Sequence, residues 1–97
     1  GIKYDADFFS NAESFITPPG DFTALVAAAV NDVTGRRPAL SASGGTSDAR
    51  FVSRYCPVVE CGLVNATIHK TDECAALADI NTLTEIYGTI LRRFFSA

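Results

Sequence analysis

Three polar residues, Asn65, His69 and Glu73, lie four residues apart within residues 62–74, and His69 is the only histidine of the chain. In a helical or turn-rich loop, this spacing would place an amide, an imidazole and a carboxylate on one surface. Neutral imidazole is the commonest metal ligand among side chains, and a carboxylate beside it can orient its second ring nitrogen. The spacing is compatible with a metal site that has His69 as a ligand and Glu73 behind it, but taken alone it favours the simpler interpretation. A surface or capping histidine is the plain alternative.

Two other sites could also be built around this histidine. The first is a four-ligand zinc site made of Cys56, Cys61, His69 and Cys74. It lacks the closely spaced cysteine pair from which structural zinc sites usually start. The second is a hydrolase triad made of Ser47, His69 and Asp72. The carboxylate is too near the histidine in sequence for that role, and the chain has no nucleophile elbow. Both remain minor alternatives.

A second polar loop, residues 44–48, has the sequence Gly-Gly-Thr-Ser-Asp. Paired glycines let the backbone turn sharply or approach a ligand closely. The three polar residues can cap a short helix after the loop, and the free N–H groups of that helix would favour an anion. The plain alternative is an ordinary strand-to-helix turn, and the loop is not a Walker motif, because the Gly-Lys-Ser/Thr ending is missing.

The elements around these loops predict an α/β fold. Short strands are expected near residues 2–8, 38–43 and 57–61. Because strand, helix and strand follow each other from 38 to 61, the last two strands should be parallel with a right-handed crossover. Their loops would then leave neighbouring carboxyl ends, where open α/β sheets bind ligands. We expect a short mixed sheet that contains this parallel βαβ unit and is packed by about three helices.

Two of the helices have clear apolar stripes. The stripe of the first is formed by Phe22, Leu25, Val26, Ala29, Val30 and Val33. The stripe of the last is formed by Ile80, Leu83, Ile86, Tyr87, Ile90, Leu91 and Phe94. In both stripes, the apolar residues recur every three or four positions, as they do on one face of an α-helix. Asp21 and Asp79 are candidate N-caps, and Gly35 is a candidate stop for the first helix.

Composition limits the classes of function. The 97 residues, 47% hydrophobic and 20% charged, suit one small globular domain or part of a larger one. A net charge of −3 without a basic face predicts no nucleic-acid partner. No run of 18 apolar residues occurs, so we expect no membrane span. An odd count of three cysteines and the lack of a signal peptide at the start predict a reducing, cytoplasmic location.

Two stretches, residues 43–51 and 59–74, resemble the carboxyl-terminal part of the zinc aminoacylase and carboxypeptidase superfamily. Residues 15–20, Phe-Ile-Thr-Pro-Pro-Gly, resemble the point where the lid domain of that family returns to its catalytic domain. The family pattern usually has glycine in place of Ala49 and a larger apolar residue in place of Cys61. The resemblance implies the end of the lid domain and a return strand at 1–17, and the last part of the catalytic domain at 18–97.

The resemblance implies a hydrolase that removes succinate from N-succinyl-LL-2,6-diaminopimelate, in bacterial lysine and cell-wall precursor synthesis. Two zinc ions would activate a water that attacks the succinyl amide, and a glutamate would take the proton of that water. His69 matches the last metal ligand of the family. The positions that match substrate contacts are Gly45, Thr46, Ser47 and Asn65.

The other ligands and the glutamate of the family pattern are not in this sequence, so we expect a carboxyl-terminal fragment that is inactive alone. Its partners would be a small acylated amino acid and the remainder of its own chain. Because the predicted strands lack neighbours, exposed apolar surface should make the fragment a homodimer. The alternative is a free-standing α/β binding or interaction module.

Overall fold

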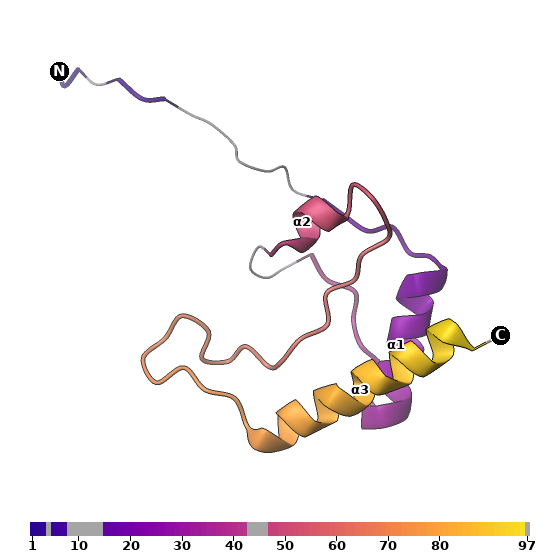
Figure 1. The fold of residues 1–97 in the computed structure, drawn as a ribbon. Helices are drawn as coiled ribbons and strands as arrows, with labels where there is room; N and C mark the ends of the chain where they lie inside the picture. The colour runs from indigo at the N-terminus through magenta and orange to yellow at the C-terminus, as the bar shows by residue number, and fades with distance from the viewer. Residues whose placement is uncertain (4, 8–14, 43–46, 97) are drawn as a thin grey trace.

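The computed structural model describes residues 1–3, 5–7, 15–42 and 47–96 (Figure 1). Three helices lie in these ranges: α1 at Asp21–Thr34, α2 at Ala49–Val52 and α3 at Leu77–Phe95. In Figure 1, α1 and α3 cross, α2 stands apart from them, and a long irregular segment leads from α2 to the start of α3. The described ranges therefore contain three helices, but not the sheet that they were predicted to pack.

The predicted mixed sheet with its parallel βαβ unit is wrong, since the described ranges contain no strand. Residues 38–42 and 57–61 are irregular, and side chains bond to backbone groups that a sheet would have paired. The Thr17 hydroxyl donates to Val58 O at 2.6 Å, and the Tyr87 hydroxyl donates to Cys61 O. Parallel strands are stable when both of their faces are buried. Residues 38–42 and 57–61 are not buried on both faces in this way. Their apolar pattern alone is therefore not enough to form a sheet.

Helix α1 ends at the residue predicted from the sequence, but its N-cap differs from the predicted one. Gly35 has a φ of 72°, and its N–H donates to Asn31 O at 2.8 Å, which closes α1 with a left-handed residue. Asp21 is the first helical residue and not the N-cap, because Gly20 occupies that position without a side-chain capping bond. An acidic residue in the first turn still interacts favourably with the helix dipole.

The last helix begins before its predicted cap. Ala76 is the N-cap of α3, so Asp79 lies in the first turn of a 19-residue helix. Arg92 and Arg93 lie in the last turn, where cations suit the carboxyl-terminal end of the dipole. Within the described ranges, α3 and the other helices are too short or too polar to cross a membrane.

The two long helices share a small core, formed by Thr23, Val26, Ala29 and Ile86. Ala29 has no exposed surface, so a short side chain lies where the helices meet and lets their backbones come close. At one end of the contact, the Phe22 and Phe94 rings pack edge to face with centroids 6.1 Å apart. Asp32 and Arg93 form an exposed ion pair, which adds little stability in water.

Much of the apolar surface stays open. The accessible area is 8332 Å², against about 5,400 Å² expected for a folded 10.3 kDa chain. The radius of gyration is 17.5 Å, against about 13 Å for a compact chain of this length. The α3 stripe shows the same openness: Ile86 is buried, whereas Leu91 and Phe94 are each 57% exposed. The contact between α1 and α3 therefore buries only part of the apolar surface that the sequence pattern predicts to be buried.

The contact between α1 and α3 can be tested with two identical substitutions at neighbouring positions. Ala29→Leu should lower stability by about 1–3 kcal/mol, because the added side chain has no space at the helix contact. Ala28→Leu should change stability little, because Ala28 is exposed on the same helix. Thermal unfolding followed by circular dichroism at 222 nm measures both. Equal melting temperatures for the two variants would contradict the packing described here.

Candidate functional site

The loop that carries His69 is made of tight turns and not of a helix. Ile68 N–H donates to Asn65 O at 3.2 Å, and Lys70 N–H donates to Thr67 O at 3.0 Å. His69 and Asp72 have positive φ values of 59° and 58°. Histidine and aspartate tolerate this region better than most residues other than glycine. Two successive turns therefore place His69 on the outside of a sharp bend.

The Thr67 side chain closes this loop. Its hydroxyl donates to Cys74 O at 3.1 Å and accepts a bond from Cys74 N–H at 3.0 Å. Thr67 was not among the site residues predicted from the sequence. The available signal was a hydroxyl residue beside a polar turn, since threonine often bonds to nearby backbone groups in such places.

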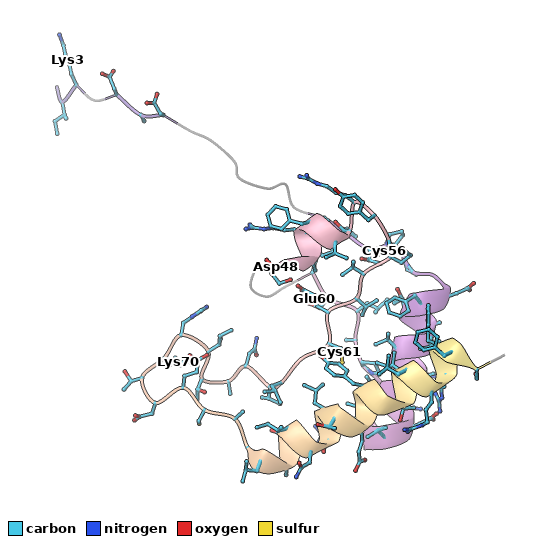
Figure 2. All side chains as sticks on the ribbon, viewed as in Figure 1. Lys3, Asp48, Cys56, Glu60, Cys61 and Lys70 are labelled. Carbon is cyan, nitrogen blue, oxygen red and sulfur yellow. The ribbon has the colours of Figure 1, made fainter. Side chains whose placement is uncertain are left out.

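The predicted site residues of this loop are all exposed: Asn65, His69 and Glu73. The imidazole of His69 makes no hydrogen bond or ion pair with the described ranges, so its ring nitrogens are available to a ligand. The helical face that would bring Glu73 beside His69 is not formed, because turns replace the helix. Figure 2 shows the labelled Lys70 on the part of this loop that projects away from the three helices.

Residue Ser47 of the second predicted loop has a local structural role. Its hydroxyl oxygen accepts a bond from Ala49 N–H, the first residue of α2, at 3.1 Å, and the hydroxyl donates to a Glu60 carboxylate oxygen, while Asp48 is the N-cap of α2. These bonds join the start of α2 to the segment after it. The predicted contacts at Gly45 and Thr46 lie outside the described residues.

The two alternative sites are not formed in the described ranges. No group of three His, Cys, Asp or Glu residues there could hold a metal ion, which rules out the four-ligand zinc site. Cys56 and Cys74 are exposed free thiols, and burial raises the pKa of the Cys61 thiol, which disfavours its thiolate. The hydrolase triad is also wrong, because the Ser47 hydroxyl bonds to Glu60 and not to His69.

The described residues can therefore supply part of a metal site. A catalytic zinc site uses three protein ligands and leaves one position for water. His69 suits one of those positions, because its imidazole is exposed and makes no hydrogen bond within the part of the chain that the structure describes. Further ligands would have to come from another segment or another chain.

An open groove of about 770 Å³ lies elsewhere, between residues 15–25, residues 53–58 and the end of α3. Its lining is mostly apolar and includes Phe15, Phe22 and Phe94. Cys56 lines it, but neither Ser47 nor any residue of the 62–74 loop does, so this groove is separate from the candidate metal loop.

Comparison with known proteins identifies close relatives. The chain is 59% identical over 97 residues to the succinyl-diaminopimelate desuccinylase of Xanthobacter autotrophicus, which covers 99% of this chain and 26% of the relative. It is 60% identical over 87 residues to the enzyme of that name from Rhodopseudomonas palustris, which covers 90% of this chain and 22% of the relative.

A third relative, from Rhizorhabdus wittichii, has the same name. It is 61% identical over 82 residues, which make up 84% of this chain and 22% of the relative. The chain thus spans about a quarter of the length of these curated relatives. The resemblance inferred from the two motifs is confirmed, since residues 3–93 match the family directly. The chain belongs to Peptidase family M20/M25/M40.

Proposed function

We propose that these residues form one part of a longer metal-dependent amide hydrolase, called the full-length hydrolase below. Its substrate would be N-succinyl-LL-2,6-diaminopimelate, and its products succinate and LL-diaminopimelate. The observation that carries this proposal is about 60% identity, over most of the chain, to relatives named succinyl-diaminopimelate desuccinylase. In a bacterium this reaction would serve lysine and cell-wall precursor synthesis in the cytoplasm.

Within that enzyme, His69 would be one ligand of a site for two zinc ions. Zinc in such a site supplies a water nucleophile at neutral pH. Support comes from the exposed imidazole on its turn, together with the family match. Glu73 would orient the second ring nitrogen of His69, and this role needs the loop to bring the two side chains together.

Substrate contacts would come from both predicted loops. Asn65 is exposed next to the turn that carries His69, so its amide can reach a bound acylated amino acid. Gly45, Thr46 and Ser47 would contribute from the loop before α2, mainly through backbone N–H groups and the Thr46 hydroxyl. Residues 1–17 would belong to the lid domain and residues 18–97 to the catalytic domain.

The alternative, a free-standing binding module, has less support. Its core would consist of the few buried residues between α1 and α3, and small domains need a larger buried fraction to fold alone. A free-standing module would also give the exposed His69 on its turn no role.

The central test compares the 97-residue chain with the full-length hydrolase. With zinc present, the full-length hydrolase should release succinate from N-succinyl-LL-2,6-diaminopimelate. The 97-residue chain alone should release none, because it holds one candidate ligand where a catalytic site needs three. Succinate is quantified by a coupled enzymatic assay. Turnover by the short chain, or none by a folded, zinc-loaded full-length hydrolase, would contradict the proposal.

The role of His69 is tested by metal content. In the full-length hydrolase, His69→Ala should weaken zinc binding and activity by about 100-fold or more, since the loss of an outer partner alone costs 10–100-fold. Lys70→Ala is the matched control, because Lys70 is the exposed neighbour on the same turn. Zinc per protein after dialysis and initial rates are measured for both. A His69→Ala variant with normal zinc content would remove His69 from the site.

We propose that the full-length hydrolase buries the open faces of α1 and α3 against the rest of its chain. The 97-residue chain alone should instead form a homodimer at micromolar concentration, because a second copy can cover the same exposed surface. Leu91→Lys should weaken this dimer, whereas Asn81→Lys, at an exposed polar position of α3, should not. Sedimentation velocity measures the oligomeric state. A stable monomer would contradict the dimer and favour the module.

A further inference from the structure

Thr67 bonds to both backbone polar groups of one distant residue. Its hydroxyl donates to Cys74 O at 3.1 Å and accepts from Cys74 N–H at 3.0 Å. A hydroxyl has one donor and two acceptor positions, so one side chain can satisfy both groups, as a neighbouring strand would. Thr67 is half-buried, whereas the residues between it and Cys74 are exposed. The hydroxyl therefore closes the loop across seven positions of sequence.

The main chain of the same residue fixes the turn inside the loop. Thr67 O accepts the Lys70 N–H at 3.0 Å, so residues 67–70 form a β-turn with His69 in its third position. A type II turn requires a positive φ at that position, and His69 has a φ of 59°. Non-glycine residues keep such a conformation only where the surrounding structure holds them in it. Thr67, the first residue of the turn, provides this restraint through the bond that its carbonyl oxygen accepts.

Asp72 also has a positive φ, 58°, in the part of the loop that the Thr67 hydroxyl closes. The segment from 68 to 73 thus contains two residues in the left-handed region between two anchor points. Both anchors belong to Thr67: its carbonyl oxygen at the turn and its hydroxyl at Cys74. Loss of the hydroxyl would free the second anchor and let the whole loop sample other conformations.

We propose that Thr67 is a positioning residue, which holds the loop in the conformation that presents His69 to a divalent metal ion. This role rests on the proposed function, because it takes His69 as a metal ligand. Thr67 itself does not contact metal or substrate in this proposal. It acts by keeping the imidazole in place before metal arrives, so that binding does not have to order the loop.

The test uses three variants in the full-length hydrolase. Thr67→Val removes the hydroxyl at nearly constant volume, and Thr67→Ser keeps the hydroxyl. Thr71→Val makes the first change at an exposed position of the same loop, as a matched control. Cobalt affinity is measured by competition with a chelating dye, and amide exchange of residues 65–76 by mass spectrometry. The first readout needs no turnover, and the second needs no metal.

Thr67→Val should bind cobalt about tenfold more weakly and exchange faster in residues 65–76, because partners that orient a ligand are worth about 10–100-fold in metal affinity. Thr67→Ser and Thr71→Val should stay close to the parent protein in both readouts. The α1 and α3 segments should exchange at the parent rate in all three variants.

The outcomes separate the two proposals. Parent-like cobalt affinity in Thr67→Val, beside weakened affinity in His69→Ala, would overturn the positioning role and leave the proposed function in place. Unchanged cobalt affinity in His69→Ala would overturn both. Faster exchange across α1 and α3 in Thr67→Val would show that Thr67 supports the fold as a whole, and that result would also overturn the positioning role.

Discussion

The contact between α1 and α3 is the constraint on which the rest of this structure depends. It buries Val26, Ala29 and Ile86, and the small Ala29 side chain permits the close approach. Beyond the helix pair, a few side-chain bonds hold the other segments. Tyr87 donates to Cys61 O from α3, and the Thr17 hydroxyl donates to Val58 O. The segment that leads to the candidate loop is therefore held by one hydrogen bond from α3 and one from the residues before α1, not by a sheet.

The sequence predicted the helices better than the sheet, for a physical reason. A helix satisfies its own backbone, so the apolar stripes of α1 and α3 and the stop at Gly35 act locally. A strand needs a partner along its edge and cover on its faces. Residues 38–42 and 57–61 have the apolar composition of strands, yet the described residues offer neither condition. The predicted N-caps were wrong by one position at Asp21 and by three at Asp79, and only the first lies within the usual uncertainty at helix ends.

The candidate loop was partly predictable as well. Its only histidine and its polar composition predict a place for chemistry, and this stays a prediction. The four-residue spacing of Asn65, His69 and Glu73 suggested a common helical face, but tight turns with two positive φ angles replace it. The local signal for Thr67 was a hydroxyl residue beside a polar turn, but its bonds to Cys74, seven residues away, depend on the conformation of the whole loop.

The exposed apolar residues next to the loop indicate how a complete site would differ from this one. Leu63 and Val64, which precede the turns, are 41% and 68% exposed, and Ile68, which lies within them, is 41% exposed. In the full-length hydrolase proposed above, a further segment of protein would cover these side chains. That contact would remove water from around His69 and lower the local dielectric constant. Charge–ligand interactions strengthen in such surroundings, so the cover that completes the fold would also strengthen the binding of a metal ion at His69.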